Sequence, residues 1–397
     1  LIEVFHDAKE YGSILEVKEI DFDALEKRIE EIRNNVPEDL FELQYREVIL
    51  EKIPPLIKQA KIMSQKYDVV CTNPPYMGRR GMNTKLKTFL DETFKYSKND
   101  LFATFIEKGF DFLNNTGLNA LVTMQSWMFL SIFEDMRKEL FRNKTLVNLL
   151  HLGNMVLGIA FKTTVSVWKN NFMSEYKTTF SKVKNNEVGD RIDKILSDNI
   201  KIALKDLSAI PGFPIAYWIN SKVLDIFANS IKLGDIADIK DGITTGDNNR
   251  FLRLWYEINY DNVGFSILSS EHAEQSGYKW FPYNKGGKFR KWFGNNDYLI
   301  NWANDGSEIK AFKGSTIRNS NFYFKRGITW TLLSNNNLFS VRVGIEGSLF
   351  DVNGKSVFPI NDKNYLYVLG LLNSKVAYEC LKILSSTMAF QVGDVKR

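Results

Sequence analysis

The chain has 397 residues, 44% of which are hydrophobic, and its 52 basic and 47 acidic residues give a formal net charge of +5. This length allows two or three domains that each bury a core, and the composition excludes a largely disordered chain. The basic excess is mild, so it indicates a polyanionic partner only if the basic residues cluster. Only two cysteines are present, which argues against a disulfide framework and favours a reducing, cytoplasmic location.

The sequence predicts neither a metal site nor a membrane partner. The three histidines, His6, His151 and His272, are scattered without metal-ligand spacing. No apolar run approaches the ~18 residues that a membrane span requires, and no signal peptide opens the chain. Because the sequence starts with Leu1 in an apolar run, we interpret it as a piece of a longer protein.

The first half of the chain alternates between predicted helices and strands. Apolar spacing predicts two helices within residues 22–65, and a helix capped by Asn99 and Asp100 follows near residue 101. A strand over 118–124, a helix over 131–141 and strands over 145–152 and 163–168 come next. This alternation predicts an α/β fold with a mostly parallel sheet and helices on its faces.

A strand over residues 67–72, between the first helices and the capped one, leads directly into Asn73, Pro74, Pro75 and Tyr76. Its β-branched residues followed by two prolines predict a buried strand that stops abruptly at a rigid loop. In open α/β sheets ligands bind at the carboxyl ends of the strands. We therefore expect Asn73 and Tyr76 to border a ligand-binding crevice.

The second half has a different composition from the first. Residues 176–210 are charged and irregular, and prolines at 211 and 214 follow them, so we interpret 176–210 as a charged linker between domains 1–175 and 211–397. The later residues are rich in Gly, Asn, Trp, Tyr and Phe, which indicates short strands, long loops and a mixed α+β domain.

One stretch of this second half, residues 278–293, combines basic and aromatic side chains with no acidic residue. Its basic residues are Lys279, Lys285, Lys288, Arg290 and Lys291, and its aromatic residues include Trp280, Phe281, Tyr283, Phe289 and Trp292. Basic groups neutralise phosphates and aromatic rings stack on bases, so the pattern predicts a nucleic-acid surface. A solvated edge whose aromatic residues are simply core explains the same pattern about equally well.

The Asn-Pro-Pro-Tyr sequence fits a particular chemistry. An amino group on an aromatic ring or an amide is a poor nucleophile because its lone pair is delocalised. The Asn73 side-chain oxygen and the Pro74 carbonyl can each accept an N–H hydrogen bond and so localise that lone pair. The two prolines restrict the loop, and Tyr76 offers a face on which a planar base can stack. A purely structural turn after a strand is the alternative.

With these residues the sequence resembles the amino-group DNA methyltransferases that act on the exocyclic nitrogen of adenine. Asn73, Pro74, Pro75 and Tyr76 match the catalytic motif of that family. The family's next helix opens on Leu-Tyr/Phe with a phenylalanine three residues later, which matches Leu101, Phe102 and Phe105. The resemblance implies that Phe102 and Phe105 lie at the S-adenosylmethionine site. It also implies that Phe161, in Ala160–Val167, stacks with Tyr76 on a flipped target base.

The sequence is more closely similar to the PglX methyltransferases of BREX phage-defence systems and the related type IIG restriction-modification enzymes. Residues 5–13, 67–78, 240–248, 326–331 and 371–375 carry this similarity. It implies a partial Rossmann-like class I methyltransferase sheet over 1–175 and a target recognition domain over 211–397. The implied cofactor is S-adenosylmethionine. The implied partners are double-stranded DNA and other BREX defence proteins.

The sequence departs from this family in one respect. The family's glycine-rich cofactor loop, of the Phe-x-Gly-x-Gly type, is not found in it, and in the family order we expect that loop before Leu1. A noncatalytic role in DNA recognition or in assembly of a defence complex therefore remains an alternative. So does a protein-glutamine methyltransferase, since that family also uses Asn-Pro-Pro-Tyr, although it has no need for the residues after 210.

Overall fold

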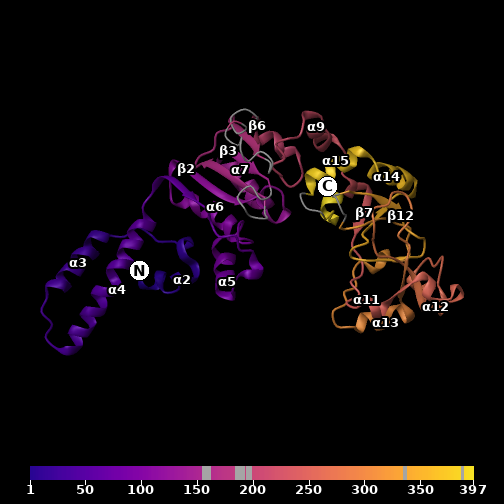
Figure 1. Ribbon diagram of the computed structural model, residues 1–397, viewed down its shortest axis with the longest axis horizontal. Coiled ribbons are helices and arrows are strands. Elements are labelled where there is room, and N and C mark those ends of the chain that lie inside the picture. The colour runs from indigo at the N-terminus through magenta and orange to yellow at the C-terminus, as the bar shows by residue number, and fades with distance from the viewer. Residues whose placement is uncertain (154–161, 184–192, 194–198, 334–337, 386–388) are drawn as a thin grey trace. The chain divides into compact units, whose positions relative to one another are not determined.

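The computed structural model describes residues 1–153, 162–183, 193, 199–333, 338–385 and 389–397. Contacts divide the chain into two units (Figure 1). The first comprises Leu1–Ser208 with Phe213–Ile219, and the second Ala209–Gly212 with Asn220–Arg397. No helix in the described ranges is long and apolar enough to cross a membrane. The same ranges contain no group of three or more His, Cys, Asp or Glu side chains arranged to hold a metal ion.

Helices α3 (Phe22–Asn34) and α4 (Leu40–Ser64) of the first unit each begin at an aspartate cap. Asp21 accepts a hydrogen bond from the backbone N–H of Ala24, and Asp39 accepts from those of Phe41 and Glu42, so both carboxylates satisfy free donors at helix starts. The two helices that follow lie side by side as a hairpin (Figure 1), as predicted for residues 22–65. The helices are α1 (Ile2–Phe5), α2 (Ala8–Tyr11), α3 (Phe22–Asn34), α4 (Leu40–Ser64), α5 (Thr84–Thr93), α6 (Leu101–Asp111) and α7 (Glu134–Asn143).

Among the described residues, the sheet of the first unit has six strands in the order β1-β2-β4-β3-β5-β6. Its strands are β1 (Tyr67–Thr72), β2 (Leu113–Met124), β3 (Thr145–Leu152), β4 (Thr163–Lys169), β5 (Lys177–Val183) and β6 (Asn199–Ala203). The expectation of a mostly parallel sheet is wrong: β1–β2 and β3–β5 are parallel, whereas β2–β4, β3–β4 and β5–β6 are antiparallel. The connection between β3 and β4 is shorter than the dozen or more residues that a parallel crossover needs, so β4 returns antiparallel.

Strand β1 is less buried than its apolar sequence predicts. It pairs with β2 along one side and has no other strand neighbour among the described residues. Val69 is 58% exposed and Cys71 is also exposed. Burial of a strand depends on having neighbours on both sides, and the sequence of the strand alone does not report that.

The predicted linker over 176–210 is wrong in its described part. Residues 177–183 and 199–203 form β5 and β6, which extend the sheet beyond β3. The charged residues of β5 lie on its exposed positions, while Thr178, Phe180 and Val183 are buried. Phe180 stacks on Tyr217, with ring centroids 4.5 Å apart. High charge in this segment therefore reflects the outward positions of a strand.

The second unit contains two four-stranded sheets, in the orders β13-β9-β10-β8 and β12-β11-β14-β7. Its mixed α+β character agrees with the prediction. The strands are β7 (Ala237–Lys240), β8 (Leu252–Leu254), β9 (Trp280–Asn284), β10 (Tyr298–Asn301), β11 (Ile328–Trp330), β12 (Val341–Val343), β13 (Leu349–Phe350) and β14 (Ser356–Pro359). The helices are α9 (Ser221–Asn229), α10 (Leu233–Ile236), α11 (Asn248–Phe251), α12 (Ser270–Ser276), α13 (Ala303–Ala311), α14 (Tyr365–Leu372), α15 (Lys375–Leu384) and α16 (Val392–Lys396).

Each sheet of the second unit belongs to its own apolar cluster. One cluster joins strands β9 and β10 with aromatic residues such as Phe281, Tyr283 and Phe350. The other joins β11, β12 and β14 with α14, α15 and α16, around the fully buried Trp330. Helices α14 and α15 are separated at Asn373 and Ser374, and the side chain of Ser374 caps α15.

Replacing Phe180 by Ala tests whether β5 belongs to the core. We expect the free energy of unfolding to fall by about 3–5 kcal/mol, because a fully buried stacked ring is lost. Urea unfolding measures this change. Phe172→Ala, which removes a ring that is 54% exposed, is the control and should cost less than about 1 kcal/mol. Equal small effects of both substitutions would contradict the placement of β5.

Candidate active site at the carboxyl end of strand β1

The Asn-Pro-Pro-Tyr loop leaves the sheet at the carboxyl end of β1. Pro74 is buried, whereas Asn73 and Pro75 are exposed. The Tyr76 hydroxyl lies 3.1 Å from Asn73 Oδ1 and 3.2 Å from the carbonyl oxygen of Val122 in β2, and can donate its single proton to either acceptor. The loop is therefore anchored to the neighbouring strand, and the amide of Asn73 is oriented by Tyr76.

Burial raises the pKa of the Tyr76 hydroxyl, so the phenol remains a neutral donor near pH 7. The carboxamide oxygen of Asn73 has two lone pairs, and Tyr76 engages one of them. A second hydrogen bond, from the amino group of a substrate, can thus be accepted without removing the first.

Asp100 ties the far end of the loop to helix α6. Its Oδ1 accepts hydrogen bonds from the backbone N–H groups of Met77 at 3.0 Å and Phe102 at 3.4 Å. The Met77 carbonyl in turn accepts from the N–H of Leu101 at 3.0 Å. Burial raises the pKa of Asp100, and the N–H groups that it accepts from oppose that rise. The sequence predicted Asp100 as a helix cap, and its contact with the loop was not foreseen.

The two phenylalanines expected at a cofactor site differ in position. Phe102 is 1% exposed, and its ring meets Tyr76 edge-on with centroids 6.1 Å apart. It therefore supports Tyr76 from within the core and offers no open face. Phe105, one turn further along α6, is half-buried against a cluster that includes Ile14 and Leu101. Phe161, expected to stack on the target base, lies outside the described residues.

The basic and aromatic stretch of the second unit divides into a core half and an exposed half. Phe281 and Tyr283 in β9 are buried, as the core interpretation expects. Lys285 lies 3.1 Å from the buried carboxylate of Asp351 and 3.0 Å from Asn248. Lys279 is exposed, at the start of the stretch.

The loop after β9 forms the exposed half. Lys288, Arg290 and Lys291 are exposed, and Lys291 donates to the carbonyl of Asn373 at 2.8 Å. Three aromatic residues lie among them: Phe289 is 44%, Trp292 53% and Phe293 71% exposed. The backbone of Trp292 is fixed to β12 by hydrogen bonds with Val341 and Val343 at 3.0 and 2.9 Å. This loop is therefore a fixed surface that presents three cations and three rings.

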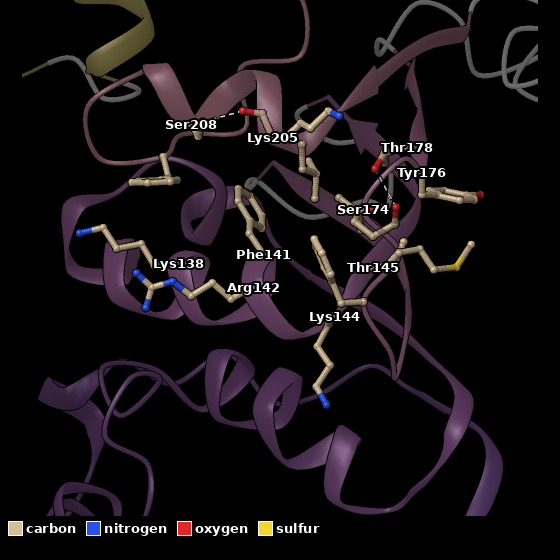
Figure 2. A pocket seen from close by; sticks show the side chains of 15 residues that line it. Lys138, Phe141, Arg142, Lys144, Thr145, Ser174, Tyr176, Thr178, Lys205 and Ser208 are labelled. Carbon is tan, nitrogen blue, oxygen red and sulfur yellow. Dashed lines mark hydrogen bonds between the residues drawn. The ribbon is translucent and has the colours of Figure 1, made fainter. Parts of the chain in front are cut away.

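A separate cavity of about 200 Å³ opens beside the amino end of β3 (Figure 2). Phe141 points into it, whereas the Lys144 ammonium points away and contacts Asn170. Because β3 begins at Thr145, which lines this cavity, the cavity lies at the sheet edge opposite to Asn73. None of the residues that line this cavity was predicted as a site residue.

Comparisons with known proteins indicate the class of protein to which this chain is similar. Residues 6–156 match the Eco57I restriction-modification methylase family. Among solved structures, the type IIL restriction-modification enzyme MmeI in complex with DNA superimposes with a TM-score of 0.51 at 12% identity, covering 85% of this chain and 46% of that one. The match supports the fold class predicted from the sequence.

Two curated relatives are closer in sequence. The adenine-specific methyltransferase BrxX of Escherichia coli O9:H4 (strain HS) is 39% identical over 403 residues, covering 99% of this chain and 32% of BrxX. The adenine-specific methyltransferase PglX of Lacticaseibacillus casei (strain Zhang) is 34% identical over 361 residues, covering 86% of this chain and 30% of PglX. The predicted resemblance to PglX methyltransferases is thus confirmed, and the chain spans about a third of the length of these relatives.

Asp100→Ala should loosen the candidate site without unfolding the chain. We expect faster hydrogen exchange at the amide of Met77 and a loss of about 1–2 kcal/mol in unfolding free energy, since two backbone donors lose their acceptor. Hydrogen exchange with mass spectrometry measures the first effect. Asp39→Ala, which removes the cap of α4, is the control and should leave exchange at Met77 unchanged. Unchanged Met77 exchange in Asp100→Ala would rule out the anchoring role.

Proposed function

We propose that the protein is a site-specific DNA adenine-N6 methyltransferase that transfers a methyl group from S-adenosylmethionine to a flipped adenine, in phage defence and host DNA modification. The observation that carries this proposal is the exposed amide of Asn73 at the end of β1, held by a Tyr76 that is itself anchored to β2. The similarity to adenine-specific methyltransferases along 99% of the chain supports it.

In the proposed mechanism, Asn73 Oδ1 and the carbonyl of Pro74 accept the two N–H bonds of the adenine amino group. This localises the nitrogen lone pair and directs it toward the methyl donor. When bound, S-adenosylmethionine supplies a methyl group on a sulfonium, which is a good leaving group. Tyr76, braced by Phe102, stacks on the extruded base. Positioning of the nucleophile accounts for most of the rate increase.

The described residues fit one side of the cofactor. Phe105 is half-buried and lies on the helix that Asp100 joins to the catalytic loop, so its ring can pack against the cofactor's adenine. The turn Gly12–Ile14 lies beside α6, and Gly12 and Ser13 line a hollow along β1. Groups for the charged end of the cofactor are not evident among these residues, because the sequence has no Phe-x-Gly-x-Gly loop.

We further propose that residues 211–397 recognise double-stranded DNA through the loop after β9. Lys288, Arg290 and Lys291 would neutralise phosphates, and the exposed rings of Trp292 and Phe293 would contact bases. Lys285 is held by Asp351, so we assign it a smaller share of phosphate binding than these three. Lys279 adds a further cation at the start of the stretch. Other BREX defence proteins are proposed partners of the intact protein.

A noncatalytic role in DNA recognition is the second candidate, and the missing glycine-rich loop favours it for this chain on its own. A protein-glutamine methyltransferase would use the same Asn73 chemistry. The exposed basic loop in the second unit has no use in that reaction, which favours DNA. Incorporation of labelled methyl groups into DNA or into protein separates these functions.

Asn73→Ala in the intact protein tests the catalytic assignment. We expect methyl transfer to DNA to fall by at least about 1,000-fold, because the amino lone pair is no longer localised, while DNA affinity stays within a few-fold. Methylation and DNA binding are measured on the same preparation. Asn35→Ala, at the end of α3, is the matched control and should retain full activity. Near wild-type methylation by Asn73→Ala would refute the proposed function.

Lys288→Ala combined with Arg290→Ala tests the DNA surface. We expect weaker binding to all sequences and a salt dependence reduced by about 2 in log Kd against log salt, since two phosphate contacts are lost. Binding is measured by anisotropy across salt concentrations. The control replaces the exposed Lys27 and Lys52 of α3 and α4. An equal change in both double variants would indicate only an effect of net charge.

A further inference from the structure

His151 is a buried histidine that the mechanism above does not use. It lies near the carboxyl end of β3 and is 7% exposed. Both ring nitrogens have partners: Nδ1 lies 3.2 Å from the Tyr217 hydroxyl, and Nε2 lies 2.5 Å from Oε1 of Gln125. Gln125 directly follows β2, and its backbone N–H donates to the carbonyl of Lys162 at 3.1 Å.

These contacts define the direction of each hydrogen bond. The amide oxygen of Gln125 can only accept, so Nε2 of His151 carries the proton, and Nδ1 accepts from the Tyr217 hydroxyl. Burial, together with smaller contributions from the charges of Lys182 and Lys162, lowers the pKa of His151 to about 4. Burial also raises the pKa of Tyr217. The imidazole therefore stays neutral near pH 7, and the chain from Tyr217 through His151 to Gln125 keeps one arrangement.

These contacts hold the side-chain amide of Gln125 through its oxygen atom. Its oxygen is held by His151, its nitrogen forms no hydrogen bond with the residues that the structure describes, and Gln125 is half-buried. An amide nitrogen can only donate. The side chain therefore holds an oriented pair of N–H donors at the carboxyl end of β2.

Gln125 lies at the same edge of the sheet as the catalytic loop. Strands β1 and β2 are parallel, so Asn73 and Gln125 both follow carboxyl ends of neighbouring strands. The Tyr76 hydroxyl meets the carbonyl of Val122, and Gln125 is three residues further along, or about 10 Å.

We propose that Gln125 donates a hydrogen bond to a ring nitrogen of the extruded adenine, and that His151 and Tyr217 are positioning residues for that donor. This inference rests on the proposed function. Asn73 and Pro74 hold the exocyclic amino group, and stacking on Tyr76 leaves the base free to turn in its own plane. A donor to a ring nitrogen on another edge of the base stops that rotation. Ring nitrogens of adenine are acceptors, which matches the amide N–H groups of Gln125.

The test uses the intact protein and DNA containing the adenine site that it methylates, identified by sequencing of modified bases. We expect Gln125→Leu to lower kcat/KM by about 10- to 100-fold, the effect of losing one hydrogen bond to a buried acceptor. Gln125→Glu keeps the size of the side chain and replaces the donor by an acceptor, so it should lose at least as much. Gln44→Leu, an exposed glutamine on α4, is the matched control.

Base analogues distinguish recognition from a structural role. With 1-deaza-, 3-deaza- or 7-deazaadenine at the target, each of which lacks one ring nitrogen, the wild-type protein should lose about 10- to 100-fold in kcat/KM with one analogue. Gln125→Leu should show no such loss with that analogue. His151→Phe should lose part of the discrimination, and adding Gln125→Leu to it should remove the remainder, so that the double variant behaves like Gln125→Leu alone.

The outcomes separate this inference from the proposed function. If the wild-type protein methylates DNA and Gln125→Leu is fully active, Gln125 is not a recognition residue and the inference is overturned. If Gln125→Leu is impaired but keeps the wild-type penalty with all three analogues, its role is structural and the inference is again overturned. If the wild-type protein does not methylate DNA, the proposed function fails and this inference fails with it.

Discussion

The parallel pairing of β1 with β2 is the constraint on which the candidate site depends. It places Thr72 opposite Leu121, so that Asn73 leaves the sheet beside Val122, whose carbonyl meets the Tyr76 hydroxyl. A slip of one residue would turn the side chains of β1 to the other face of the sheet and remove Tyr76 from this carbonyl. Asp100 then fixes the other end of the loop, so both ends of a short, proline-rich segment are held by neighbouring elements.

The sequence predicted this first unit well where local signals decide the structure. Asp100 caps helix α6 as predicted, two helices form within residues 22–65, and Asn-Pro-Pro-Tyr follows a strand. The predictions from the sequence were wrong where the pairing of strands in three dimensions determines the structure. The position of β4 between β2 and β3, and the exposure of β1, depend on which strands meet. The hydrogen bond between Gln125 and His151 joins residues that are distant in sequence, and neither residue forms a motif by itself.

In the second unit, composition identified the basic and aromatic stretch over residues 278–293, but it did not show which part of the stretch is core and which is exposed. Aromatic residues at 281 and 283 belong to a strand and pack into a core, whereas those at 289, 292 and 293 lie on the loop that follows. The core interpretation is therefore confirmed for Phe281 and Tyr283, whereas the nucleic-acid surface stays a prediction for the exposed loop. Aromatic residues occur in cores and on binding surfaces alike, and only the end of β9 at Asn284 separates the two.

The exposed side of β1 also makes a thiol accessible next to the Asn-Pro-Pro-Tyr loop. Cys71 is exposed and lies two positions before Asn73, whereas Cys380, in the second unit, is half-buried and has its pKa raised by that burial. Thiolate formation controls the reactivity of cysteine, so an alkylating reagent will modify Cys71 in preference to Cys380. A fluorophore or spin label attached there would report directly on movements of the Asn-Pro-Pro-Tyr loop.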